Sequence, residues 1–203
     1  MKFRIGIPVF VLIRPRGGGF VYSDDELEVM KRDVHVARDE GADGIVIGAL
    51  DNGGRVNLAI TRELIDAGGE LPATFHRAFD ATRDPASALD ALIGAGVTRV
   101  LTSGGAASAR EGTDVIARLV DQAGDRIVVM AGGGVREHNV REIIARTGVS
   151  EVHARISSVS GQPGERADPP MRLRRPLPED ENVWEELDEP RMRALVDIVQ
   201  LTV

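Results

Sequence analysis

The chain reads TFHRAFD from Thr74 to Asp80, and this stretch decides how the rest of the sequence is interpreted. It begins as an apolar strand pattern and ends abruptly in a histidine, an arginine and a carboxylate. Three further apolar runs close in the same way on small or polar residues, at Leu101–Gly105, Met130–Val135 and Glu151–His153. Repeated units of strand, polar loop and helix predict a parallel sheet with one functional edge.

Six segments rich in Val, Ile and Leu are predicted to be strands, because continuous apolar runs suit strands that are buried on both faces. They are residues 8–13, 44–49, 73–76, 99–102, 126–131 and 151–154. Helical patterns separate them and end at glycines shortly before the next strand. The unit length of roughly 25 to 35 residues is typical of a (β/α) barrel or of an open doubly wound sheet.

Three helix starts have recognisable capping signals. Ser23 with Glu26 and Ser108 with Glu111 have the spacing of capping boxes. Pro85 suits the first position of another helix. These signals predict helices that cover the faces of the sheet.

Composition limits the classes of protein and partner. With 203 residues, of which 42% are hydrophobic and 28% charged, the chain is expected to form a single barrel-like domain over 1–203. A formal net charge of -7 and a pI near 5.2 argue against nucleic acid as a partner. No apolar stretch approaches the roughly 20 residues of a membrane span. The absence of cysteine excludes disulfides and thiolate ligands.

The regular pattern fails beyond Ile156. Proline, glycine and charged residues predict a long loop over residues 156–187. A final helix over residues 188–202 is indicated by an apolar stripe of Met192, Leu195 and Val199, with Pro190 in its first turn.

Two histidines, His76 and His153, lie at the ends of predicted strands, and parallel strand ends converge at the carboxyl face of a barrel. The pair is therefore a candidate metal site. Without cysteine it suits zinc or Cu(II) better than Cu(I). The alternative is a metal-free site in which each histidine hydrogen-bonds a neighbour.

Three arginines, Arg14, Arg16 and Arg77, also lie just past strand ends. Guanidinium groups gathered at one edge would recognise the carboxylate or phosphate of a small anion. The alternative is ion pairing with Asp80, Glu151 or a neighbouring subunit. Glu151 shares strand parity with His153, so if both point inward the carboxylate needs an arginine partner.

Small residues follow two other strands. Ser103 and Gly104 could contact a ligand, but no base lies beside Ser103 in the sequence, so a serine nucleophile is unsupported. Gly132, Gly133 and Gly134 offer backbone N–H groups that could cradle an anion. The alternative for both segments is a tight turn between a strand and a helix.

Six motifs in register resemble the CutC copper-homeostasis family. They are Ile13–Gly18, Phe20–Asp24, Thr74–Asp80, Leu101–Gly104, Met130–Val135 and Glu151–His153. The resemblance covers roughly residues 8–154 and implies a TIM-type (β/α) barrel, a cytoplasmic setting, a homo-oligomer and a role in copper handling. The family's cysteines have no counterpart here, so a copper role that depends on them does not carry over.

The resemblance also implies that the first βα unit of the family is missing. The strand over residues 8–13 would then have an unpaired edge, which a partner chain, the C-terminal segment or local distortion must cover.

Three hypotheses follow. The first is a CutC-like copper homeostasis protein that binds a metal ion, copper or zinc, or a small anion at the carboxyl mouth of the barrel. The second is a barrel enzyme acting on a phosphorylated or carboxylated metabolite, with histidine as acid or base. The third is a fragment or structural homologue that has lost its activity.

Overall fold

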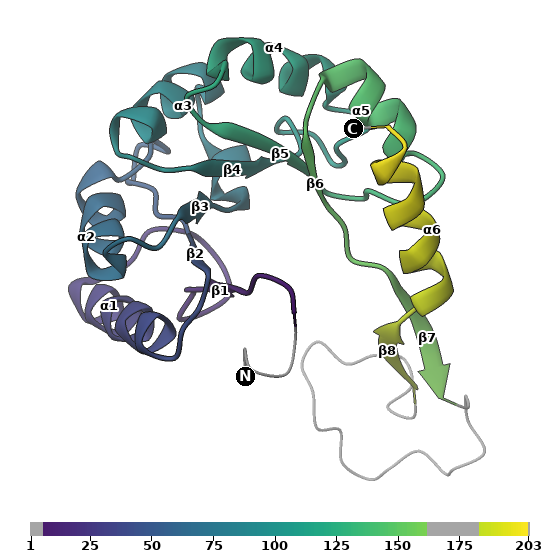
Figure 1. The fold of residues 1–203 in the computed structure, drawn as a ribbon. Helices are drawn as coiled ribbons and strands as arrows, with labels where there is room; N and C mark the ends of the chain where they lie inside the picture. The colour runs from purple at the N-terminus through teal and green to yellow at the C-terminus, as the bar shows by residue number, and fades with distance from the viewer. Residues whose placement is uncertain (1–5, 162–182, 203) are drawn as a thin grey trace, which may run out of the picture.

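The structure is a computed structural model that describes residues 6–161 and 183–202. Six parallel strands, hydrogen-bonded in the order β1-β2-β3-β4-β5-β6, form a sheet that curls into half of a barrel with helices outside it (Figure 1). The α/β fold with a parallel sheet is confirmed. The strands are β1 (Phe10–Leu12), β2 (Gly44–Ile47), β3 (Ala73–Phe75), β4 (Arg99–Thr102), β5 (Val128–Gly132) and β6 (Glu151–His153).

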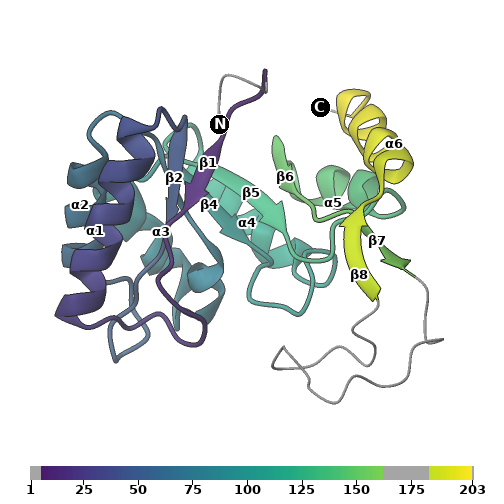
Figure 2. The ribbon, with the colours of Figure 1, turned by 90° about the horizontal axis from the view of Figure 1, so that it is seen from below.

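Five helices follow the first five strands and cover the convex face of the sheet (Figure 2). They are α1 (Asp24–Asp39), α2 (Leu58–Gly68), α3 (Pro85–Gly94), α4 (Thr113–Ala123) and α5 (Val140–Thr147), and a 3-10 helix, η2 (Arg77–Ala81), precedes α3. Successive side chains along each strand point to opposite faces of the sheet, so only every second residue packs against the helices. Ile45, Phe75 and Val129 face the helices and are buried in the core.

The sheet is open, unlike the eight-stranded ring of a complete barrel. β1 and β6 are its two edges, and no strand within residues 6–161 and 183–202 pairs with the outer side of either. The C-terminal segment does not cover β1, because its helix packs on α5 at the other end of the half-barrel (Figure 1). The side chain of Leu12 on β1 is accordingly exposed.

The concave face holds the arginine partner predicted for Glu151. Arg99 begins β4 and Glu151 begins β6, and Arg99 Nη2 donates to Glu151 Oε1 at 2.8 Å. The same guanidinium stacks on Phe10, 5.1 Å from the ring centroid. Both residues start their strands, so the pair lies away from the carboxyl ends and stabilises the inner face.

Two of the three helix starts predicted from capping signals are confirmed. Ser23 and Glu26 form the capping box of α1, and Asp84 caps α3 ahead of Pro85. The start predicted at Ser108 is wrong, because α4 begins only after Gly112. A Cβ on Gly112 would lie 1.9 Å from the Ser103 carbonyl oxygen, so the chain crosses tightly over the end of β4 before it can become helical.

Regular structure also occurs at the two ends of the predicted 156–187 loop, which corrects that prediction. β7 (Ser157–Gly161) and β8 (Val183–Leu187) pair as an antiparallel ribbon, while residues 162–182 lie outside the described part. α6 (Glu189–Gln200) follows, with Asp188 as its N-cap, and buries Leu195.

No helix in the described ranges combines the length and the apolar composition that crossing a membrane requires.

Candidate functional site

The carboxyl ends of the six strands lie along one edge of the curled sheet, because all six strands are parallel. The residues predicted to bind a ligand do not form one group at this edge. Four of them, Arg14, His76, Arg77 and Ser103, divide between two clusters, and His153 on β6 lies beside the second. The Tyr22 cluster, at β1 to β3, consists of Arg14, Phe20, Tyr22 and His76. The Asp80 cluster, at β3 to β5, consists of Arg77, Asp80, Thr102 and Ser103.

His76 is the centre of the Tyr22 cluster. It follows β3 and is the N-cap of η2, where its Nδ1 accepts a hydrogen bond from the Ala78 N–H at 3.0 Å. The side chain is only 6% exposed, and its ring centroid lies 5.2 Å from that of Phe20. His76 Nε2 is buried and has no hydrogen-bond partner among the described residues. Such an atom is costly in a folded protein, so a ligand that reached it would gain a strong contact.

The bond to Ala78 determines which form of the His76 ring is present. A neutral imidazole has one N–H and one lone pair, and the lone pair of Nδ1 is already used by the amide. Nε2 therefore carries the proton and is a donor. A metal ion would need a lone pair at that nitrogen, so His76 in this conformation cannot coordinate a metal through Nε2.

The charge of His76 is set by its surroundings. Burial, followed by the nearby positive charge of Arg14, lowers the pKa of His76 from 6.5 to about 4. The ring is therefore neutral at neutral pH. A neutral hydrogen-bond donor next to a permanent cation favours binding of a negatively charged group.

Arg14 and Tyr22 add two more donors. The Arg14 guanidinium lies 4.8 Å from the Phe20 ring centroid, and its Nη2 donates to the Gly18 carbonyl at 2.7 Å. Arg14 Nε and the Tyr22 hydroxyl are buried, and neither has a hydrogen-bond partner in the described part of the chain. Burial raises the pKa of Tyr22, while the charges of Arg14 and Arg16, together with the close approach of the Arg14 side chain to the hydroxyl, oppose that rise. The hydroxyl is therefore protonated at neutral pH.

Arg16, predicted to bind the ligand, makes bonds within the chain that shape the loop after β1. Its Nε donates to Glu26 Oε1 at 2.5 Å, and its terminal nitrogens donate to the carbonyls of Gly19 at 2.9 Å and Val21 at 2.7 Å. These bonds fold residues 14–22 over the end of β1 and bring Tyr22 into the cluster. The ion-pair alternative thus describes Arg16, although its partner Glu26 was not anticipated.

The Asp80 cluster is internally satisfied. The Asp80 carboxylate accepts from Arg77 Nε at 2.7 Å, from the Thr102 hydroxyl at 2.5 Å and from the amides of Ser103 and Gly105 at 3.0 Å. Arg77 Nη2 also donates to Ser103 Oγ at 2.6 Å. The ion-pair alternative given for Arg77 is what the structure contains. Ser103 is buried, and its bonds to Arg77 and Asp80 connect β4 to the segment after β3.

The glycine segments belong to the same edge. Gly104, with φ of 70°, packs against the Gly112 backbone, where a Cβ would lie 2.6 Å from the Gly112 carbonyl oxygen. Gly133, with φ of 104°, adjoins Arg77 and Ser103. Gly134 also has positive φ, and its carbonyl accepts from Asn139 Nδ2. The helix α5 begins only at Val140, so the glycine run is a turn and not the start of a helix.

His153 lies apart from His76. It ends β6, pairs in register with Gly132 on β5, and is exposed. Burial of part of the ring, followed by the charge of Arg77, lowers the pKa of His153. Two strands, β4 and β5, separate its strand from that of His76. Within residues 6–161 and 183–202, no group of three or more His, Asp or Glu side chains is arranged to hold a metal ion.

Sequence reasoning missed Phe20 and Tyr22 as site residues, although both lie in the motif that follows β1. One signal was available, since Tyr22 is the only tyrosine in the chain. It also missed Gly48, after β2, where a Cβ would lie 2.3 Å from His76 Cε1. This contact shows that the imidazole occupies the space a side chain at position 48 would fill.

Together, the fold and this edge define a protein of the (β/α)-barrel class with a polar site at the carboxyl ends of its strands. The sequence matches the CutC family over residues 2–158. The chain belongs to the CutC family.

Relatives and a solved structure support this assignment. The family protein CutC of Xylella fastidiosa strain Temecula1 is 53% identical over 159 residues, covering 78% of this chain and 60% of that protein. A mouse protein named copper homeostasis protein cutC homolog is 50% identical over 163 residues, 79% of this chain and 60% of its own length. The chain thus spans about three fifths of these relatives. The crystal structure of a CutC protein from Streptococcus agalactiae, described as a copper homeostasis protein, matches with a TM-score of 0.72 and 37% identity over 74% of each chain.

Proposed function

We propose that this CutC family protein binds a small anion, a carboxylate or a phosphate, at the Tyr22 cluster. We further propose that this binding is its part in the copper homeostasis for which its mouse and streptococcal relatives are named. One observation carries the proposal: three buried atoms without partners, Arg14 Nε, the Tyr22 oxygen and His76 Nε2, belong to one cluster within the described residues. The two nitrogens can only donate hydrogen bonds and the hydroxyl can donate one, so the fitting ligand is an acceptor.

The charges of the Tyr22 cluster also favour an anionic ligand. Arg14 is permanently cationic, His76 is neutral at neutral pH because its pKa is about 4, and the nearby Glu26 carboxylate is paired with Arg16. The cluster therefore has a net positive charge without a ligand. A carboxylate or phosphate oxygen would satisfy the donors and balance this charge through charge-assisted hydrogen bonds.

The metal alternative, copper or zinc between His76 and His153, has less support. His76 presents a proton and not a lone pair, and the Arg14 cation beside it would repel a second positive charge. His153 lies next to the Asp80 cluster, on β6, and two strands, β4 and β5, separate it from the strand that precedes His76. The chain also has no cysteine to supply the soft ligand that Cu(I) prefers.

The enzyme alternative needs a group that exchanges protons near neutral pH. With a pKa of about 4, His76 is a hydrogen-bond donor at that pH and a poor proton-transfer group. Ser103 Oγ donates to the Ala106 carbonyl at 2.6 Å and accepts from Arg77, so it is not poised as a nucleophile. Recognition without chemistry is the function that these contacts support.

The test is isothermal titration with inorganic phosphate and with malonate, and separately with Cu(II) and Zn(II). His76→Asn is the informative variant, because asparagine keeps an acceptor for the Ala78 amide at the N-cap but does not reach the position of Nε2. We expect it to weaken anion binding roughly tenfold or more, the effect of losing one strong hydrogen bond. His35→Asn, on the exposed face of α1, is the matched control and should bind as the wild type does.

One result of these titrations would contradict the proposed anion site. Metal binding that His76→Asn abolishes, with no anion bound by the wild type, would replace the anion site by a metal site. Acidity separates the two further, because metal affinity through histidine falls when the ring is protonated. Anion affinity should hold or rise between pH 7 and pH 5, since a bound anion favours the charged ring.

A further inference from the structure

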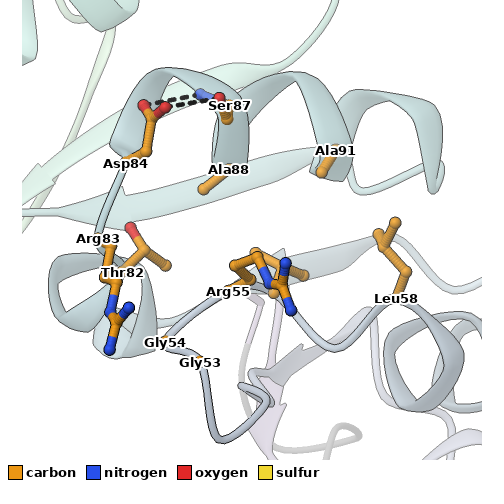
Figure 3. Close-up of a pocket in the computed structure, with 11 residues that line it drawn as sticks. Gly53, Gly54, Arg55, Leu58, Thr82, Arg83, Asp84, Ser87, Ala88 and Ala91 are labelled. Atoms are coloured by element: carbon orange, nitrogen blue, oxygen red, sulfur yellow. Dashed lines mark hydrogen bonds between the residues drawn. The ribbon is translucent and has the colours of Figure 1, made fainter.

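A second cleft lies outside both clusters, between the loop that follows β2 and the start of α3 (Figure 3). Its volume is about 520 Å³, which is within the range of small-molecule sites in proteins. Its walls are Gly53–Val56 and Leu58 on one side and Thr82–Asp84, Ser87, Ala88 and Ala91 on the other. None of these residues belongs to the Tyr22 or Asp80 cluster.

Two guanidinium groups border this cleft. The side chain of Arg83 has no hydrogen bond or ion pair in the part of the chain that the structure describes, whereas its backbone N–H donates to the Gly54 carbonyl at 3.1 Å and ties the two walls together. Arg55 uses its Nε for Asp51, at 3.0 Å, and is otherwise exposed. The unpartnered guanidinium of Arg83 and the terminal nitrogens of Arg55 can therefore donate to a ligand.

The acidic residue in the cleft is directed elsewhere. Asp84 Oδ1 accepts from the amides of Ala86 and Ser87, both at 3.1 Å, and Oδ2 accepts from the Ser87 hydroxyl at 2.7 Å. These bonds, the Ser87 hydroxyl first, lower the pKa of Asp84. Its charge is thus committed to the first turn of α3, which leaves the arginines as the groups that meet a ligand.

Apolar side chains form the rest of the lining. Leu58 at the start of α2 lies across the space from Ala88 and Ala91 on α3, and Arg55 lies on the same side as Leu58, between it and Arg83 (Figure 3). Small alanines on one wall leave room for an apolar body, and the arginines provide charge at one end. The arrangement fits neither a bare inorganic ion nor a neutral hydrocarbon.

We propose that this cleft is a binding site for a small amphiphilic anion, an apolar chain or ring that carries one carboxylate, sulfonate or phosphate. The acidic group is held by Arg83 and Arg55, and the apolar part lies between Leu58 and the alanines of α3. The site is separate from the anion site proposed at the Tyr22 cluster. Either proposal can therefore fail without the other.

The test uses 8-anilinonaphthalene-1-sulfonate, an aromatic sulfonate whose fluorescence rises in an apolar environment, titrated into the full chain. Arg83→Met keeps an apolar stem and removes the charge, and we expect it to weaken binding roughly tenfold. Ala91→Phe should fill the cleft and suppress the fluorescence. Arg118→Met, at an exposed arginine on α4, is the matched control and should match the wild type.

Competition tests the charge directly. Hexanoate should displace the probe, while hexylamine, of the same chain length and opposite charge, should not. Equal displacement by both, or wild-type affinity in Arg83→Met, would overturn the proposal. Arg83 is exposed and makes no side-chain bond in the described ranges, so its variant tests binding without a risk to folding even if Ala91→Phe is unstable.

Discussion

Two neighbouring clusters at one edge of the sheet contain similar residue types and have opposite hydrogen-bond states. In the Asp80 cluster, arginine, carboxylate and hydroxyl groups satisfy one another. In the Tyr22 cluster, Arg14 Nε, the Tyr22 hydroxyl and His76 Nε2 are buried without partners among the described residues. Because buried polar groups are normally paired, the first cluster is explained by stability and the second calls for a ligand. Residue type and position at a strand end do not distinguish these roles.

The largest effect is expected from Asp80→Ala. This substitution leaves the Ser103 and Gly105 amides, the Thr102 hydroxyl and the Arg77 guanidinium without their common acceptor. We expect the free energy of unfolding to fall by about 3–5 kcal/mol, because the buried Thr102 hydroxyl and Ser103 amide each lose an acceptor, at about 1–3 kcal/mol per group, and the Gly105 amide and Arg77 lose theirs as well. Chemical denaturation measures it. A fall in the free energy of unfolding of less than about 1 kcal/mol would show that the Asp80 cluster does not stabilise the fold.

Acidification should produce the next largest effect, at the other cluster. The unfolded state binds a proton at His76 with the ordinary pKa of 6.5, whereas the folded state does so only at about 4. Stability from this residue is therefore present above pH 6.5 and is lost as pH falls toward 4, by up to about 3 kcal/mol. His153 acts in the same direction because its pKa is also lowered.

Denaturation of His76→Asn across the same pH range provides the comparison. Its stability should depend less steeply on pH between 6.5 and 4. Parallel curves for the two proteins would show that His76 is not buried in its neutral form.

Gly48→Ala should affect both stability and binding. The added Cβ would lie 2.3 Å from His76 Cε1, so the buried ring must move. We expect a loss of about 1–3 kcal/mol in the free energy of unfolding, typical of overpacking. Anion affinity should fall as well, although no donor has been removed. Unchanged affinity, measured by titration calorimetry, would place the ligand away from His76.

The smallest and most discriminating effect is expected from Tyr22→Phe. Removing a buried hydroxyl that has no partner should stabilise the ligand-free protein by about 1 kcal/mol. The same change should weaken anion binding, because the ligand loses a donor. Thermal unfolding with and without phosphate measures both effects. Destabilisation of the ligand-free protein would show that the hydroxyl already has a partner in solution.

Much of the fold could be predicted from local patterns. Runs of Val, Ile and Leu that end before small or polar residues identified all six strands of the sheet to within two residues at every end. The β7–β8 ribbon was missed because Ser157 pairs with Leu187, a contact far apart along the chain, and the strand SSVSG has little apolar pattern. The start of α4 was missed because the close approach of Gly112 to Ser103 is also a tertiary contact.

The candidate site was predictable only as a set of positions. Strand ends correctly indicated where His76, Arg77 and Ser103 would lie. Which of them bind each other could not be read from spacing, because that depends on the paths of the loops. The role of Tyr22 in particular depends on the hydrogen bonds that Arg16 donates to the carbonyls of Gly19 and Val21, in the loop between Arg16 and Tyr22.

The several bonds of Arg16 have a consequence for comparing family members. One planar guanidinium reaches Gly19, Val21 and Glu26 at once, a geometry that the single ammonium group of lysine does not reproduce. Selection on this position would therefore be as strict as on a residue that touches the ligand. An arginine invariant here in an alignment would record the shape of a loop, and reading it as a recognition residue would assign specificity to the wrong side chain.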